Sequence, residues 1–485
     1  MTLTSEPRQP AGYSWRSSKM LIVMAISIAM LTDYFVFSFI LPILPDILEG
    51  RLRANPSHTQ LFTSIILSMN AIVSIAIAPL VGYLSDRTRR KNTLMQSAYL
   101  IHVVGTAVTA WATTVAGLII GRLIQTIASS LLWIAGMAIL GGSVEPNELA
   151  RVMAICMLFL TAGLLSGPVV SAALFNSVSY SLTWLSVFLV LIVGMTLQSL
   201  ILEPYNFPSK IEQDSPNTAE HDQPSESPRE TDALLPPVRE RYKSLAGNPE
   251  EQNTEHPAPA SSAQIYKLML QKWRVTTALI AETLLAILIS SFEATIPLHI
   301  KEAFHWQSLQ AGILFLLLQL PTIILIFPAG WLKDTFGMRL PVSTGFLLMA
   351  PSLWMLGAPG TRQFDRWVDV KTGQIIFTVA LIMIGVCRTL VMGFGAVEVL
   401  RGAAELASEH PGMFGTSTGH SRAFVLSNVT WKFGMFVGPL LSGFLTEEIG
   451  YYFMNLILAI SSLFMGVLTY VALGERRLVF GYGVS

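Results

Sequence analysis

Long apolar stretches alternate with short polar ones along most of this 485-residue chain. A helix of about 20 apolar residues crosses a bilayer, and a segment in lipid must satisfy its own backbone amides, which favours helices. The pattern predicts twelve membrane-spanning helices, at residues 20–44, 60–82, 93–111, 114–140, 151–175, 180–202, 275–298, 308–331, 340–358, 374–398, 423–446 and 450–473. The expected fold class is therefore an all-α membrane protein.

The longest polar segment separates the sixth and seventh predicted spans. It is rich in Pro, Glu, Asp, Ser and Gln and contains few aromatic residues. Such a composition cannot bury enough apolar surface to offset the entropy that is lost on ordering. We therefore expect a disordered cytoplasmic linker at 203–272 between two six-helix bundles, residues 20–202 and 273–473, with cytoplasmic tails at 1–19 and 474–485.

The composition supports a membrane protein and argues against several other classes. Hydrophobic residues make up 52% of the chain and charged residues only 13%, against about 25% charged residues in a typical soluble domain. The formal net charge is zero, so we expect no nucleic-acid partner. Cys156 and Cys387 both lie in apolar runs, which predicts buried thiols rather than a disulfide or a metal site. The chain has no Walker lysine motif, nucleophile elbow or HExxH motif, so we expect neither enzyme activity nor a cofactor.

The positions of Lys and Arg predict the orientation in the membrane. With a cytoplasmic N-terminus, the cytoplasmic segments contain 22 of these residues and the outside loops contain 6. Cytoplasmic loops are normally enriched in Lys and Arg, so both termini are expected inside. The first 19 residues lack the apolar core of a signal peptide, so we expect the first span to stay uncleaved. We expect the plasma membrane; the stretch Glu230–Leu235 resembles an acidic dileucine sorting signal, which leaves a vacuolar or endosomal membrane as the alternative.

One polar turn occurs twice, 248 positions apart. Both copies read G-x-L-x-D, continue into basic residues, and follow the second span of their half. A carboxylate there can cap a helix and pair with a nearby Arg, so the turns are predicted to close a cytoplasmic gate; a solvated turn shaped by glycine is the alternative. The predicted gate residues are Gly82, Asp86, Arg90, Gly330, Asp334 and Arg339.

A second motif, GxxxGPxxS, occurs in the fifth span of each half. Glycine lets two helices approach closely, and proline removes an intrahelical hydrogen bond and bends the helix. The motif is therefore predicted to act as a hinge, with plain close packing as the alternative. Its residues are Gly163, Gly167 and Pro168 in the first half and Gly434, Gly438 and Pro439 in the second. Two motifs repeated in the same order indicate a parallel duplication of six helices.

These repeats resemble the loop and helix motifs of the major facilitator superfamily. Arg122 and Gln125 resemble the RxxQ motif that its proton-coupled antiporters place at the proton-coupling site. Asp33 precedes a Pro-x-x-Pro in the first span and Glu293 precedes Pro297 in the seventh, which is similar to the twelve-span drug:proton antiporters near the vesicular amine transporters. The central linker makes the chain more similar to fungal multidrug and metabolite exporters. The resemblance implies two pseudo-symmetric six-helix bundles.

Six ionisable residues lie inside the predicted spans, where a charge is costly unless it is paired or faces a cavity. They are Asp33, Arg122, Glu282, Glu293, Arg388 and Lys432. A desolvated carboxyl group can exchange a proton near neutral pH. We predict that proton coupling or substrate binding involves Asp33, Arg122, Gln125, Glu293, Arg388 and Lys432. The alternatives are structural pairing, for example of Glu293 with Arg388, and a snorkelling side chain for Glu282.

The same residues constrain the substrate in part. The vesicular amine transporters carry acidic residues in helices 10 and 11, where this chain has Arg388 and Lys432. A permanent cation suits an acidic or polyoxygenated substrate. Six aromatic residues are candidates to line an apolar cavity for planar or lipophilic solutes: Tyr34, Phe35, Phe37, Phe39, Trp133 and Trp431. The alternative for each is a contact with lipid or with a packing partner.

We therefore expect a secondary transporter that exports small organic molecules, such as drugs, toxins or secondary metabolites, in exchange for protons. It is expected to alternate access as a monomer, with a small-molecule substrate, protons and the lipid bilayer as its partners. A nutrient importer or facilitator of the same fold is the first alternative. The second is a receptor that senses a solute without transporting it.

Overall fold

The computed structural model describes residues 13–201 and 262–473, apart from residues 89, 145, 362–363, 365–368 and 411–419. These residues are helical, without strands. The long helices of the first half are α2 (Lys19–Phe39), α4 (Thr59–Arg87), α5 (Lys91–Trp111), α6 (Val115–Ser143), α7 (Pro146–Ser177) and α8 (Tyr180–Leu200). Those of the second half are α11 (Trp273–Phe304), α12 (Ser308–Phe336), α13 (Arg339–Gly357), α14 (Val370–Val391), α16 (His420–Ile449) and α17 (Tyr451–Ala472). The shorter elements are α1 (Tyr13–Arg16), α3 (Leu44–Asp46), the π-helical turn η1 (Ile47–Arg51), the 3-10 turn η2 (Pro56–His58), α10 (Ser262–Gln271) and α15 (Phe394–Glu409).

Each predicted membrane span overlaps one of the long helices, although the first helix, α2, ends at Phe39 and not at residue 44 as predicted. Ten helical segments of the described chain are long and apolar enough to cross a membrane. The spans predicted at 93–111 and 423–446 coincide with α5 and α16, which are not among those ten. The predicted all-α membrane fold is confirmed.

The end of the tenth predicted span is wrong. A single helix was expected over 374–398, but α14 ends at Val391 and Gly393 adopts a φ of 80° before α15 begins. The positive φ favours glycine and lets the chain change direction there. In α15, the buried Glu398 accepts hydrogen bonds from Arg274 at 3.0 Å and Arg401 at 2.8 Å. The hydrophobic pattern did not reveal this break, because apolar residues continue on both sides of it.

The predicted linker at 203–272 overlaps α10. Ile265 and Met269 of this helix are buried in a small apolar cluster with residues of α11 and α15. The remaining linker residues and most of the predicted tails lie outside the described residues.

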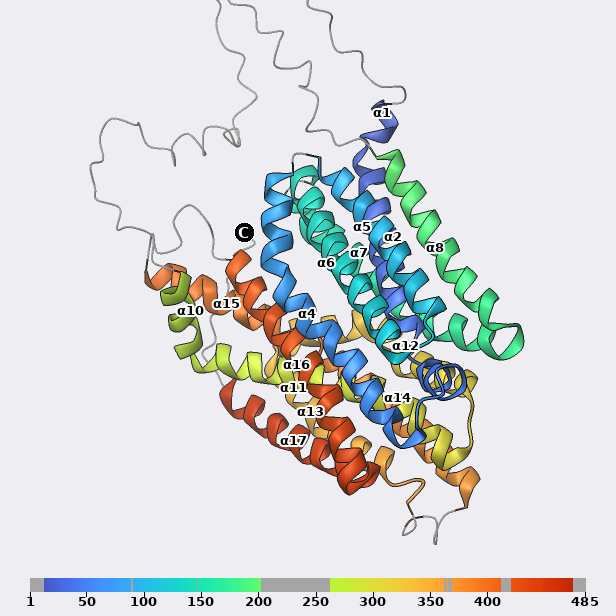
Figure 1. Ribbon diagram of the computed structural model, residues 1–485. Helices are drawn as coiled ribbons and strands as arrows, with labels where there is room; N and C mark the ends of the chain where they lie inside the picture. Colours follow the sequence, from blue (N-terminus) through green and yellow to red (C-terminus); the bar gives the residue numbers. More distant parts are fainter. Residues whose placement is uncertain are drawn as a thin grey trace, which may run out of the picture.

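Each half has its own core. One cluster of buried apolar residues draws on residues 22–201, and a second draws on residues 278–473. Figure 1 shows the two bundles, converging toward the lower right and diverging toward the top and the left. We call the end with α3, η1 and residues 294–308 the outer end and the opposite end the inner end, after the orientation expected from the charge count. The halves therefore converge at the outer end and diverge at the inner end.

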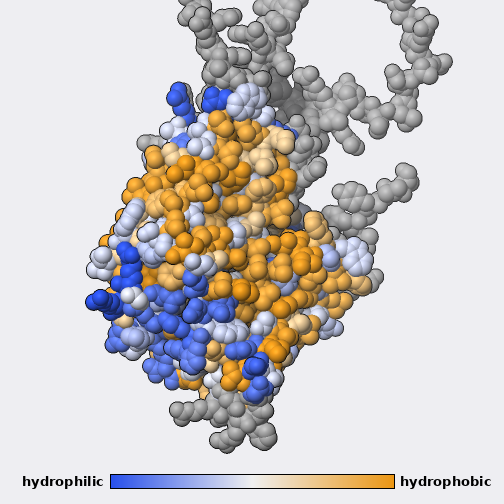
Figure 2. Space-filling model, turned by 90° about the vertical axis from the view of Figure 1, so that its right-hand side faces the viewer, coloured by the Kyte–Doolittle hydropathy of each residue, from blue (hydrophilic) through white to orange (hydrophobic). Residues whose placement is uncertain are grey.

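The surface is typical of a protein surrounded by lipid. Many large apolar side chains are exposed on the long helices, including Leu189, Phe327 and Phe464. Figure 2 shows a broad hydrophobic surface, with hydrophilic residues gathered mainly in one patch. Apolar surface of this extent marks an interaction with membrane or protein, and its position on the predicted spans indicates lipid.

The repeated GxxxGP motifs pack α7 against α2 and α16 against α11. A Cβ atom added at Gly167 would lie 2.6 Å from the Phe35 carbonyl oxygen, and one at Gly438 would lie 2.7 Å from that of Ile287. Real Cβ atoms do not approach backbone so closely, so only glycine fits these crossings. The pairs of helices are equivalent in the two halves, as the internal repeat predicted.

The two helices that carry the motifs, α7 and α16, also take part in the contact between the halves. Gly312 of α12 lies against Pro168 of α7, and Gly443 of α16 lies against Ser64 of α4. Toward the outer end, a buried apolar cluster brings together side chains from four helices or their ends, Leu41, Leu67, Ala294 and Phe315. The hydrogen bonds that join the halves between described residues all lie at this end. In one of them, the Gln60 side chain donates to the Ala294 carbonyl.

Candidate binding site between the two halves

A cavity of about 600 Å³, including its open side, lies between the halves on the inner side of the apolar cluster. It is lined by Asp33, Tyr34 and Phe37 of α2, Leu67, Asn70 and Ala71 of α4, Ser129 of α6, Ser290 and Glu293 of α11, and Trp431, Lys432, Met435 and Pro439 of α16. Both halves thus contribute one acidic residue and aromatic or apolar side chains. Pockets of this composition bind small organic ligands.

Asp33 is the acidic residue of the first half. Its side chain is only 5% exposed, and the Ser129 hydroxyl donates a 2.7 Å hydrogen bond to its Oδ2 atom. Lys432 and Arg122 are near enough to act on the carboxylate electrostatically. Neither makes an ion pair with it within the described part of the chain, so the alternative of structural pairing is not observed for Asp33 in this conformation.

Glu293 is the acidic residue of the second half. It is also 5% exposed, lines the cavity, and has no hydrogen bond to another described residue. Arg388, Arg122 and Lys432 act on it electrostatically, Arg388 most strongly. The alternative of a direct pair with Arg388 is not observed, because that guanidinium donates a 2.6 Å hydrogen bond to Gln319 instead.

The RxxQ residues form a buried network behind the cavity. Arg122 donates to the Gln125 Oε1 atom at 3.0 Å, and Gln125 donates to the Thr106 hydroxyl at 2.9 Å. The Arg122 guanidinium also lies 5.8 Å from the ring centroid of Phe37, with one nitrogen 3.5 Å from the Phe37 carbonyl oxygen. Arg122 therefore links α6 to α2 one turn from Asp33.

Lys432 is the one basic side chain that lines the cavity among the described residues. It has neither a hydrogen bond nor an ion pair to another residue that the structure describes, whereas Arg122 and Arg388 are held by side-chain amides. Glu282 lies elsewhere: it accepts hydrogen bonds of 2.8 and 2.9 Å from the Ser427 hydroxyl and does not line the cavity.

The predicted aromatic lining is correct only in part. Tyr34, Phe37 and Trp431 line the cavity. Phe35 and Phe39 instead belong to the core of the first half, and Trp133 packs against that core. Ser129 was missed, although its spacing from Arg122 places both on one face of α6. Asn70, which accepts a 2.9 Å hydrogen bond from Thr126, also belongs to the lining.

The predicted gate residues lie at the inner end. Arg90 is exposed, and Gly330 borders open space. Arg339 donates a 2.8 Å hydrogen bond to the Tyr470 carbonyl and lies 4.1 Å above the ring of that residue, within its own half. The gate contact therefore stays a prediction, because the structure describes neither the surroundings of Gly82 nor the side chains of Asp86 and Asp334.

The sequence model described as Major Facilitator Superfamily matches this chain over residues 26–419 and 278–479. The chain belongs to this superfamily. Superfamily members are transporters rather than enzymes, and the cavity between the halves is accordingly a candidate for the small-molecule site.

Several relatives are similar over most of the superfamily fold. An MFS-type transporter, ppzB, of Metarhizium rileyi is 24% identical, over 98% of this chain and 99% of its own. A probable vesicular acetylcholine transporter of Danio rerio is 20% identical, over 90% of this chain and 75% of its own. A multidrug resistance protein B homolog of Mycobacterium tuberculosis is 24% identical, over 67% of this chain and 61% of its own.

Solved structures support the same fold. A bacterial homolog of the human lysosomal transporter Spinster, in an inward-facing and unoccupied conformation, has a TM-score of 0.63 at 12% identity and covers 94% of this chain and 98% of its own. The human organic anion transporter MFSD10 has a TM-score of 0.57 at 17% identity and covers 95% of this chain and 100% of its own. At these identities, the likeness concerns the superfamily fold.

Proposed function

We propose that this protein is a proton-coupled exporter of small organic molecules that works by alternating access. One observation supports this most: Asp33 and Glu293, one from each half, face a shared cavity without an ion pair to any described residue. A carboxyl group that is neither locked to a cation nor open to bulk water can gain and lose a proton as its surroundings change. Proton uptake by such a group can then be linked to movement of the halves.

The network around Asp33 supports a switching role for Arg122. An arginine keeps its charge under physiological conditions, so its effect on a carboxylate depends on the distance between them and on the local solvation. Arg122 acts on both cavity acids from its position behind Phe37. A shift of α2 against α6 would change that distance and favour proton release in one state over the other.

The cavity also favours a class of cargo. Tyr34, Phe37 and Trp431 offer flat apolar surface, and Lys432 offers a cation without an ion pair to any residue that the structure describes. We infer that the substrate is a planar or lipophilic organic molecule with an acidic or oxygen-rich group. Export is proposed from the names of the relatives, which include a multidrug resistance protein and a vesicular transporter.

The proposed exporter is a monomer with both termini in the cytoplasm, and its rigid units are residues 20–202 and 273–473. We place it in the plasma membrane, with a vacuolar or endosomal membrane as the alternative.

Accumulation of labelled solutes in cells with and without the protein tests this proposal. Export predicts lower accumulation in cells that contain the protein, and an uncoupler should abolish the difference. Equilibration that the uncoupler does not change would instead indicate a facilitator. Saturable binding without flux would indicate a receptor.

A further inference from the structure

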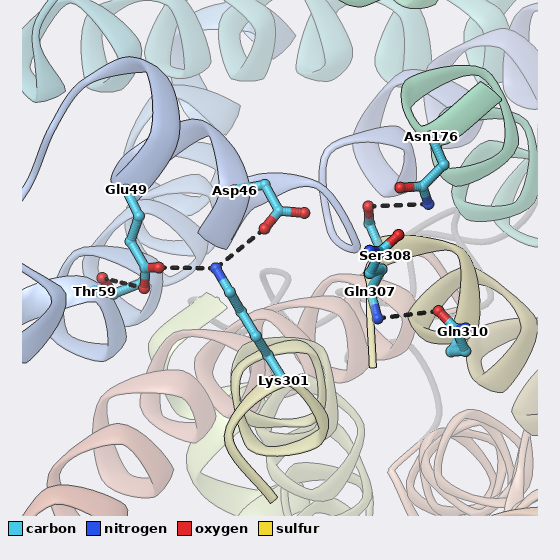
Figure 3. Close-up of polar contacts among 8 residues, drawn as sticks. All are labelled: Asp46, Glu49, Thr59, Asn176, Lys301, Gln307, Ser308 and Gln310. Carbon is cyan, nitrogen blue, oxygen red and sulfur yellow. Dashed lines mark hydrogen bonds and ion pairs between the residues drawn. The ribbon is translucent and has the colours of Figure 1, made fainter. Parts of the chain in front are cut away.

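The outer end carries a charge contact between the halves that neither repeated motif predicts. Lys301, in the last turn of α11, places its Nζ atom 3.1 Å from Asp46 Oδ1 and 2.8 Å from Glu49 Oε2 (Figure 3). The two acidic residues belong to the first half and the lysine to the second. A single cation thus bridges two carboxylates across the interface.

The first half supports Glu49 and the turn that carries it without help from Lys301. The Thr59 hydroxyl, at the start of α4, donates a 3.0 Å hydrogen bond to Glu49 (Figure 3). The turn η1 is fixed by Arg51, which donates to the Ala112 carbonyl at 3.4 Å and lies 4.2 Å above the ring of Tyr180. The carboxylates are therefore presented to the second half by a supported segment.

The contact lies where the halves must separate if the outer end opens. A second inter-half hydrogen bond, from Asn176 to the Ser308 hydroxyl at 3.4 Å, lies at the same end (Figure 3). The three charged side chains are 22% to 36% exposed. Partly exposed ion pairs are weak, so this contact can break in each cycle, whereas a fully buried pair would resist opening.

We propose that Lys301, Asp46 and Glu49 form an outer latch, whose strength sets the share of molecules in the inward-facing state. Every other inter-half contact at this end is apolar packing or a neutral hydrogen bond, within the described part of the chain. The latch requires alternating access, but it depends on neither the substrate nor proton coupling. Its failure can therefore be distinguished from failure of the proposed function.

Distance measurements between spin labels on the outer surface test the latch. Cys156 and Cys387 are replaced by alanine, labels are placed on the exposed residues Ser57 and Lys371, and the protein is studied in nanodiscs by pulsed electron paramagnetic resonance. Lys301→Gln should raise the outward-open share about threefold, as expected for loss of a partly exposed ion pair. The long-distance population should increase accordingly.

Three comparisons make the result specific. The double variant Asp46→Asn/Glu49→Gln should match Lys301→Gln, and combining all three changes should add nothing, because one contact is removed in each case. Lys301→Arg should retain the wild-type distances. Glu302→Gln, which removes a neighbouring charge without an ion pair among the described residues, should also retain them.

Two results would overturn the latch. One is an unchanged distance distribution in both the lysine variant and the acidic double variant. The other is an equal shift in Glu302→Gln, which would point to net charge rather than to the contact. Lys301→Gln changes only the second half, and the acidic double variant changes only the first. If one of these variants misfolds, the other still tests the latch.

Discussion

Asp33 is not part of an ion pair with any residue that the structure describes. Its direct partner is a hydroxyl group rather than a cation. Ser129 donates to it at 2.7 Å, and the nearby cations act from beyond ion-pair distance. A buried carboxylate without a paired cation is costly, which favours binding of a proton or of a cationic group in part of the cycle. We therefore propose that the lack of a directly paired cation lets Asp33 take part in proton coupling.

Asp33→Asn tests that claim. Asparagine has nearly the same shape and can still accept the hydrogen bond from Ser129, so folding and surface expression should be unchanged. Gradient-driven transport should fall to the background of empty vesicles, because the site can no longer exchange a proton. Asp369→Asn, which neutralises an exposed carboxylate outside the cavity, is the control and should transport normally. Full proton-coupled flux in Asp33→Asn would contradict the role.

Lys432 gives a second prediction at this scale, concerning the cargo. Replacing it by Gln removes the one basic side chain in the cavity lining that the structure describes. Affinity for an anionic solute should fall roughly tenfold or more, since charge-assisted hydrogen bonds are stronger than neutral ones. Binding of a neutral analogue should change little, and Lys432→Arg should restore part of the anion affinity. Equal loss for charged and neutral analogues, measured by equilibrium binding, would argue for a structural lysine.

At the scale of elements, the GxxxGP helices belong to two interfaces at once. α7 packs on α2 through Gly167 and on α12 near Pro168, and α16 packs on α11 through Gly438. The close-packing alternative is thus present in the structure, and a hinge role is compatible with it. Helices that contact both their own half and the opposite one are suited to transmit movement between them.

Gly167→Val should destabilise the protein. The new side chain would overlap the Phe35 carbonyl region, and overpacking of this kind costs roughly 1–3 kcal/mol. A lower melting temperature in detergent, read from fluorescence, is the expected result. Gly330→Ala is the matched control, because a Cβ atom there meets open space. Equal stability of the valine variant and the wild type would show that this crossing is less tightly packed than described.

The elements were predictable because a bilayer imposes long apolar helices, and each predicted span coincides with a helix. The break at Gly393 was not predictable, since the apolar pattern continues through it and only the backbone conformation marks it. At the site, Asp33 and Glu293 were recognisable as isolated charges in apolar runs. The hydrogen-bond partners of the buried charges were not. Ser129, which donates to Asp33, and Gln319, which accepts from Arg388, are ordinary polar residues whose roles depend on which helices meet.

At the scale of the whole molecule, the halves meet at the outer end and separate at the inner end (Figure 1). The cavity lies on the inner side of the apolar cluster described above. Leu67 belongs to this cluster and also lines the cavity. With the orientation expected from the charge count, this arrangement is an inward-facing state, and in the proposed mechanism solute and protons reach the two acidic residues from the inner side. Export then requires the outer latch to open after binding.

In the proposed mechanism, solute and proton movements are coupled at this cavity. The most direct test uses purified protein in liposomes that contain a pH-sensitive dye and a solute identified by the accumulation assay. A solute gradient should drive protons in the opposite direction, and Asp33→Asn should lose this proton movement but keep exchange of labelled for unlabelled solute. Solute flux through the wild-type protein without any proton movement would contradict it.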